Sequence, residues 1–89
     1  RLDLQQMVDE IVDESVHVAS VTIQFTVYTP TLGEAEFRLT NGEHGINILL
    51  LHASKMTANL LQSHHLAITK SLSERLGKPV NFDIDARLM

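Results

Sequence analysis

The sequence predicts an α+β fold, a two-layer sandwich in which one long helix packs on a face of a mixed four-stranded sheet. Two observations support this prediction. Apolar residues recur at helical spacing in residues 2–15 and 54–76, and patterns typical of strands occupy four other runs, 18–28, 34–40, 45–52 and 80–87. The predicted element order is therefore α-β-β-β-α-β.

The composition is that of a small globular domain and excludes several functions. Of 89 residues, 44% are hydrophobic and 20% charged, so we expect one domain over 1–89, with an N-terminal helix at 1–15 and a core at 18–87. The net charge of −4 argues against a basic surface that binds nucleic acid. The absence of cysteine excludes disulfides and thiolate metal sites. No apolar run reaches the roughly 18–20 residues of a membrane span.

The first element is an amphipathic helix over residues 2–15. Because the chain begins at Arg1 and enters this helical pattern at once, we expect it to be a domain excised from a longer protein. Acidic residues occupy one side of the helix, which is typical of a solvated face, with contact to a basic partner as the alternative. The apolar residues on the other side fall at i, i+3, i+4, i+7 and i+8: Leu4, Met7, Val8, Ile11 and Val12.

Two half-buried strands follow, joined by the turn Tyr28–Gly33. Val16 and Val18 alternate out of phase with the run that begins at Val21, so we predict either a bulge near Ala19-Ser20 or a strand that begins there. Pro30 has no amide hydrogen and Gly33 tolerates positive φ, which suits a turn. Leu32 is apolar within this turn, so it either plugs the open end of a core or is offered to a partner.

The third strand, 45–52, follows the hairpin signal Asn41-Gly42. It is apolar on both faces, because Leu49 and Leu51 lie opposite the residues expected to face the core. Strands with continuous apolar runs are covered on both sides. We therefore expect the first helix, or else a partner, to cover Leu49 and Leu51.

The clearest helix spans residues 54–76, with Ser54 as its N-cap and Gly77 just beyond its end. A right-handed crossover through this helix makes the last strand, 80–87, parallel to the third strand. We expect the last strand to lie beside the first. Its inward-facing residues are predicted to be Val80, Phe82, Ile84 and Ala86, and one apolar row of the helix holds Met56, Leu60, Ile68, Leu72 and Leu76.

The sequence contains no pattern of residues typical of a catalytic or metal site. His64 and His65 point about 100° apart on a helix, so they cannot chelate one ion together, and His64 is expected at the boundary of the core. Asp83 and Asp85 share the outer side of the last strand, where a solvated face is the expected reading. The chain has no glycine-rich phosphate loop and no nucleophile elbow. We therefore predict no enzyme activity, no cofactor and no metal.

Residues Thr29–Leu39 carry a resemblance to a known family. Their sequence, Thr-Pro-Thr-Leu-Gly-Glu-Ala-Glu-Phe-Arg-Leu, resembles the P-x-x-L-G-x-v-x-v-x-L core of two related groups of C-terminal domains. One group belongs to flagellar hook-length control proteins and the other to needle-length regulators of bacterial type III injectisomes. Pro30 stands one residue closer to Leu32 than in the commonest flagellar form. The pattern of strands and helix over residues 20–87 is similar as well.

The resemblance implies a substrate-specificity switch at the C-terminus of a secreted molecular ruler. Its partner would be the cytoplasmic part of the autocleaving membrane protein of the export gate, with needle or inner-rod subunits as further partners. The domain would act in the bacterial cytoplasm and then be secreted through the type III apparatus, as part of a virulence system. Such binding shifts a gate between two states and needs no catalysis. The His-rich, Gln-poor helix and the altered proline spacing favour the injectisome over the flagellum.

Under this resemblance, the residues expected to matter are Pro30, Leu32, Gly33 and Leu39, through the fold or through contact with the gate. The alternative function is a generic α+β interaction or dimerisation module that uses Leu49 and Leu51. For the switch domain itself we expect a monomer.

Overall fold

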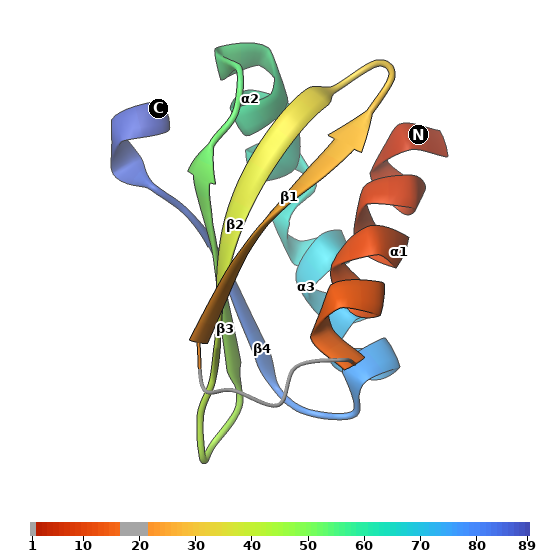
Figure 1. Cartoon of the computed structure of the whole chain (residues 1–89), viewed down its shortest axis with the longest axis vertical. Coiled ribbons are helices and arrows are strands. Elements are labelled where there is room, and N and C mark those ends of the chain that lie inside the picture. The colour runs from red at the N-terminus through yellow and green to blue at the C-terminus, as the bar shows by residue number, and fades with distance from the viewer. Residues whose placement is uncertain (1, 17–21) are drawn as a thin grey trace.

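The computed structural model describes residues 2–16 and 22–89, and the predicted phase shift near Ala19-Ser20 lies outside them. The order of elements confirms the predicted α+β class, apart from a break in the long helix and a short 3-10 turn at the end (Figure 1). The elements are α1 (Leu2–Val16), β1 (Thr22–Thr29), β2 (Gly33–Asn41), β3 (Ile46–His52), α2 (Lys55–Ser63), α3 (His65–Leu76), β4 (Val80–Ile84) and η1 (Ala86–Leu88).

The four strands form one mixed sheet in the order β1-β2-β3-β4. The pairs β1–β2 and β2–β3 are antiparallel and β3–β4 is parallel, as the right-handed crossover predicts. The expectation that the last strand lies beside the first is wrong. The crossover returns to the open edge of β3, where the Ile46 amide donates to the Pro79 carbonyl at 2.9 Å, and α1 packs on β1 at the far side of the sheet.

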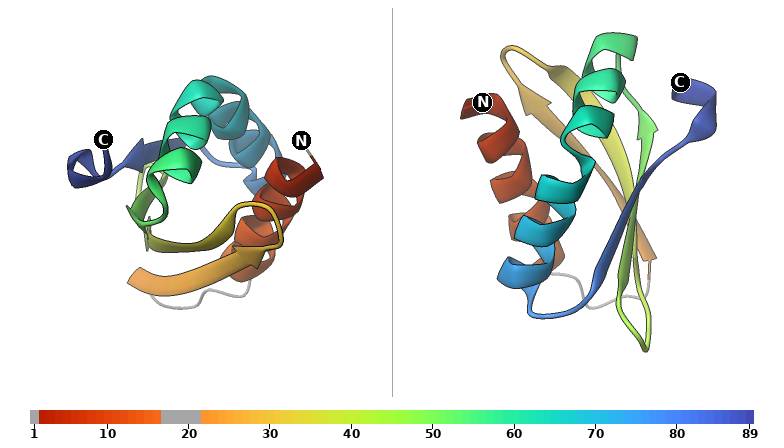
Figure 2. Two further views of the ribbon diagram at one scale, coloured as in Figure 1. Left: turned by 90° about the horizontal axis from the view of Figure 1, so that it is seen from above. Right: turned by 180° about the vertical axis from the view of Figure 1, so that it is seen from behind.

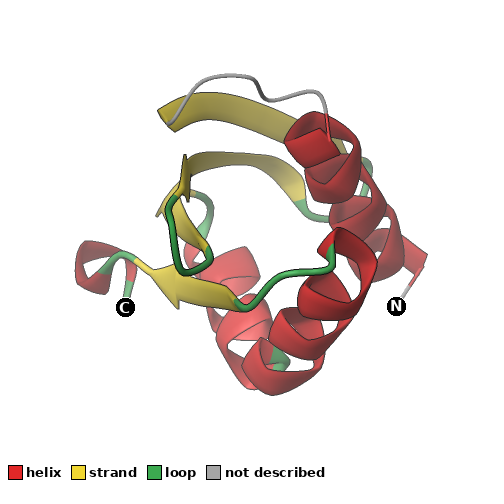
Figure 3. Ribbon diagram, turned by 90° about the horizontal axis from the view of Figure 1, so that it is seen from below, coloured by secondary structure: helices red, strands yellow, loops and turns green. Residues whose placement is uncertain are grey.

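Helix α1 and the pair α2–α3 lie on the same face of the curved sheet, and the core fills the space between the helices and the sheet (Figures 2 and 3). Helix α1 packs against α3 and β1, with Met7 and Ile11 each only 1% exposed. The prediction that the first helix covers the other face of β3 is therefore wrong. The reason is that α1 buries its apolar stripe in the same core as α3, which leaves Leu49 half-buried on the outer face.

Strand β3 changes register against β2 near its end. Phe37 pairs with Leu50 and Glu36 with His52, so Leu51 is an extra residue between two paired ones. Such a bulge bends the strand locally. Leu51 is only 6% exposed, although its neighbour His52 points to solvent.

The helix predicted over 54–76 is two helices, broken at His64. The His64 amide is shared between the Leu60 and Leu61 carbonyls, both at 3.2 Å, and the residue has φ −105° and ψ 18°. A row of residues four apart drifts by about 40° per step around a helix, so the predicted core residue Met56 lies on a different face from Leu72 and is instead 63% exposed. The residues that the two helices bury are Thr57, Ala58 and Leu61 on α2 and Ile68 and Leu72 on α3.

The predicted ends of this helical region are confirmed. The Ser54 hydroxyl accepts a hydrogen bond from the Thr57 amide at 3.1 Å, which caps α2. Gly77 ends α3 in the left-handed conformation, with φ +70°.

Two side chains of α3 reach strand β4 at the edge of the sheet. The Ser73 hydroxyl accepts a hydrogen bond from the Val80 amide at 3.1 Å. A ring nitrogen of His65 donates to the carbonyl of Phe82, and the two rings lie 6.0 Å apart between centroids. Helix α3 therefore contacts the backbone of β4 along the free edge of the sheet as well as the inner face of the strand.

The last strand ends at Ile84, earlier than the predicted 87. The Asp85 carboxylate accepts a hydrogen bond from the Arg87 amide at 3.0 Å, which starts the 3-10 turn η1. Asp side chains that bond the backbone two residues ahead favour turns over strands. Ala86 is exposed as a result and does not face the core as predicted.

The η1 turn is expected to loosen only in strong acid. Hydrogen bonds from Arg87 lower the pKa of Asp85 from 3.8 to about 2. A lowered carboxylate pKa stabilises the folded state above pH 3.8, and this contribution is lost as the pH falls towards 2. Amide exchange at Arg87 and Leu88, corrected for intrinsic rates, should be constant from pH 7 to 5 and faster below about pH 3. An equal acid response in Asp85→Asn would contradict this assignment.

Candidate functional site

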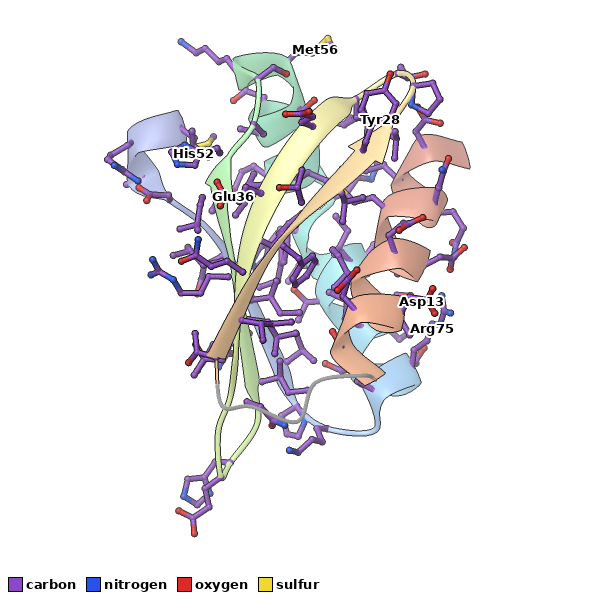
Figure 4. The ribbon with its side chains drawn as sticks, in the orientation of Figure 1. Asp13, Tyr28, Glu36, His52, Met56 and Arg75 are labelled. Carbon is purple, nitrogen blue, oxygen red and sulfur yellow. The ribbon has the colours of Figure 1, made fainter. Side chains whose placement is uncertain are left out.

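The turn between β1 and β2 lies at the end of the molecule where α1 and α2 begin (Figure 1). Its residues Thr29–Gly33 are the ones that the sequence singles out. Pro30 and Thr31 are exposed, and the side chains of Tyr28 and Met56, each 63% exposed, lie at the same end (Figure 4). A rigid core therefore presents a short exposed turn with apolar groups beside it.

Leu32 is a plug of the core. It is 5% exposed and belongs to the single cluster of buried apolar residues. From the sequence alone, Leu32 could either fill the end of the core or contact a partner. The burial of its side chain supports the first of these roles. A direct contact at this turn therefore rests on its exposed neighbours, Pro30 and Thr31.

Two fully buried threonines hold the backbone of Leu32 from both sides. The Thr29 hydroxyl accepts a hydrogen bond from the Leu32 amide at 3.3 Å. The Thr57 hydroxyl donates to the Leu32 carbonyl at 2.8 Å. Both threonines are 0% exposed, so the polar groups of the buried turn are satisfied internally. Thr57 stands in the first turn of α2, and it therefore ties the turn to that helix.

Helix α1 holds the exposed side of the same turn. The Thr31 amide donates to Oδ2 of Asp3 at 2.7 Å. Hydrogen bonding by Thr31, through its side chain and its amide, lowers the pKa of Asp3 from its ordinary value. The turn is thus anchored by both flanking helices.

Gly33 is required by its backbone conformation. Its φ is +75°, a region that L-residues with a Cβ adopt at a cost. A Cβ built at Gly33 would meet no atom within 4 Å, so the site has room for a side chain. Glycine at this position therefore reflects the angle of the turn and not the lack of space.

The other predicted site residues lie elsewhere. Leu39 is 1% exposed on the inner face of β2. Leu49 is half-buried on the outer face, in register with Arg38 on one side and Asp83 on the other. Leu51 is buried at the end of β3. The fold therefore brings Pro30, Leu32 and Gly33 together but places the three other leucines away from the turn.

Sequence reasoning missed two residues that shape the turn, Asp3 and Thr57, and it missed the role of the Thr29 hydroxyl within the turn. Each acts through a hydrogen bond to a backbone group of the turn, two of them across 25 or more residues of sequence. Only Thr57 left a signal in the sequence, because it stands three residues after the N-cap Ser54 of a clear helix. Such polar pairings depend on tertiary contact and leave no periodic pattern.

The outer face of the sheet is polar around the β3 bulge. Glu36 on β2 lies 3.8 Å from the His52 ring (Figure 4). Its carboxylate also accepts a hydrogen bond from the side-chain Nε2 of Gln24 at 3.2 Å. Asp85 is paired with Arg87 at 2.8 Å, whereas Asp83 is exposed. Within residues 2–16 and 22–89, no three His, Asp or Glu side chains are grouped so that they could hold a metal ion.

None of the helices in the described part of the chain is long and apolar enough to cross a membrane.

Comparison with known proteins gives one structural likeness. No protein-family model matches the chain, and no protein of curated function matches its sequence. The crystal structure of the PscP SS domain is similar with a TM-score of 0.76, over 92% of this chain and 90% of that chain, at 22% sequence identity. The two chains therefore share a fold along nearly their whole length.

Proposed function

We propose that this domain is a substrate-specificity switch of bacterial type III secretion, from a regulator of needle length. The observation that supports it is the shared fold with the PscP SS domain, a specificity-switch domain of a needle-length regulator. That likeness extends over 92% of the chain. The turn with Leu32 and Gly33 adds a local motif of the same type of domain.

The switch would work by binding and not by catalysis. The domain would contact the cytoplasmic part of the autocleaving membrane protein of the export gate, with needle or inner-rod subunits as further partners. Binding moves a gate from early to late substrates only if the domain has a higher affinity for one state of the gate. The exposed residues of the turn, Pro30 and Thr31, would offer the contact, while the buried Leu32 anchors the turn in the core.

Secretion of the regulator would require the domain to unfold in a narrow channel. A domain of 89 residues without cysteine has no covalent cross-link to resist this. Small domains are stable by only about 5–15 kcal/mol, which an export motor can overcome. These properties are compatible with a cytoplasmic protein that is later secreted.

The direct test is calorimetric titration of the 89-residue chain with the purified cytoplasmic part of the gate protein. We expect saturable one-to-one binding that Pro30→Ala weakens several-fold, because this exposed proline lies at the centre of the turn. Asp83→Asn is the matched control, since β4 and β1 form opposite edges of the sheet. Absence of binding by the unaltered chain would contradict the proposal.

Two other functions agree with some of these observations. A flagellar hook-length control domain would share the fold and the turn, and the altered spacing of Pro30 and the His-rich, Gln-poor helix favour the injectisome. A dimerisation module would use the outer face of β3, where Leu51 is buried and Leu49 half-buried. Analytical sedimentation of the unaltered chain and of Leu49→Glu tests the dimerisation hypothesis. A stable dimer that is lost in the variant would support it.

A further inference from the structure

The first turn of α1 makes a direct polar contact with the candidate site. Asp3 accepts the Thr31 amide hydrogen at 2.7 Å, across 28 residues of sequence. Thr31 lies at the exposed tip of the turn, between Pro30 and the buried Leu32. A carboxylate that accepts an amide hydrogen forms a charge-assisted bond, which is stronger than a neutral one. The position of α1 therefore bears on the conformation of the turn.

The remainder of α1 is held by different contacts. Met7 and Ile11 are buried in the core, and Arg75 of α3 forms an ion pair with Asp9. Arg75 lies beside the second half of α1 (Figure 4). These contacts anchor the middle of the helix to α3.

Packing between α1 and α3 is incomplete towards the end that carries Asp3. A groove of about 130 Å³ separates the helices there. Leu4 at this end is only half-buried, whereas Met7, one turn on, is 1% exposed. The groove reaches the helix break at His64. Its lining residues are Leu4, Gln5 and Val8 from α1 and His64, Ala67, Ile68 and Ser71 from the α2–α3 region.

We propose that α1 is a latch on the β1–β2 turn, with Asp3 as the positioning residue that fixes the Thr31 backbone for partner binding. The inference rests on the proposed function, because it assigns a role to α1 in the same binding event. A shift of the loosely packed first turn of α1 breaks the Asp3–Thr31 bond and frees the tip of the turn. The middle of the helix, held by Met7, Ile11 and Asp9, stays docked.

The latch predicts different behaviour for two acidic residues of one helix. Asp3→Ala removes the acceptor for the Thr31 amide, and Asp9→Ala removes the ion pair to α3 but leaves the turn untouched. Asp3→Asn is the conservative variant, because its side-chain oxygen is still an acceptor. The loss of one hydrogen bond corresponds to roughly three- to tenfold faster exchange of the amide.

The experiment measures amide exchange by NMR in the unaltered chain and in the three variants. The Thr31 amide should exchange roughly three- to tenfold faster in Asp3→Ala, while Asp9→Ala changes it less than twofold and Asp3→Asn restores most of the protection. Affinity for the cytoplasmic part of the gate protein should fall in the same order. Amides of β3 report the global stability, and the change at Thr31 in each variant is compared with theirs.

Two results would overturn the latch. One is equal Thr31 exchange in Asp3→Ala and Asp9→Ala, which would reduce Asp3 to a general packing role. The other is faster exchange in Asp3→Ala with unchanged affinity for the gate protein. If the unaltered chain does not bind the gate protein, the proposed function fails, and the exchange data alone decide whether Asp3 positions the turn.

Discussion

Replacing Leu32 with alanine should lower the free energy of unfolding by about 2–4 kcal/mol, the usual cost of a large-to-small change in a core. Leu32 is 5% exposed and its backbone is held by Thr29 and Thr57, so the turn cannot collapse into the space left behind. Urea denaturation of the purified domain measures this difference. Leu66→Ala is the control, because Leu66 is 80% exposed and its loss should change stability by less than about 0.5 kcal/mol.

A second variant separates packing from contact at Leu32. Leu32→Met keeps the volume nearly constant and should cost less than about 1.5 kcal/mol. If Leu32 acts as a plug, switching to late substrates should be normal in Leu32→Met and lost in Leu32→Ala. A Leu32→Met domain that is stable but does not switch would instead indicate direct contact by the leucine side chain.

Gly33→Ala should abolish switching, whereas Gly77→Ala should preserve it. The two glycines have φ of +75° and +70°, and a Cβ at either would meet no atom within 4 Å. The backbone cost is therefore the same at both, about 1–2 kcal/mol. Only Gly33 lies in the candidate site, so only its variant changes the conformation of the turn that is proposed to contact the partner.

The measurement compares needle length and late-substrate secretion in strains that carry each glycine variant, with urea denaturation of the purified domains. We expect overlong needles and no late substrates for Gly33→Ala alone. Failure of both variants at equal stability loss would attribute the phenotype to the fold. Normal switching in Gly33→Ala would place the contact away from this turn.

Local signals explain why most of the fold can be predicted from the sequence. Alternation locates the strands, and helix ends follow from side-chain and backbone chemistry that acts within four residues, as at Ser54 and Gly77. The turn at Leu32-Gly33 is predicted for the same reason. The last strand is shorter than predicted because the Asp85 side chain competes locally with the sheet by accepting a hydrogen bond from the Arg87 amide.

Long-range choices could not be predicted from these signals. The position of β4 beside β3, and of α1 beside α3, depends on which apolar surfaces fit together. The same holds for the helix break at His64, since periodicity continues across it. The hydrogen bonds of the turn with Asp3 and Thr57 join segments that are distant in sequence.

The contacts of α3 with strand β4 bear on how this protein behaves at high concentration. An open sheet edge offers unpaired backbone groups to other chains and promotes aggregation. Ser73 and His65 occupy the Val80 amide and the Phe82 carbonyl on that edge. If the domain is exported unfolded, as proposed, it must refold afterwards, and such protection would limit pairing between refolding copies, because each copy closes its edge with its own helix.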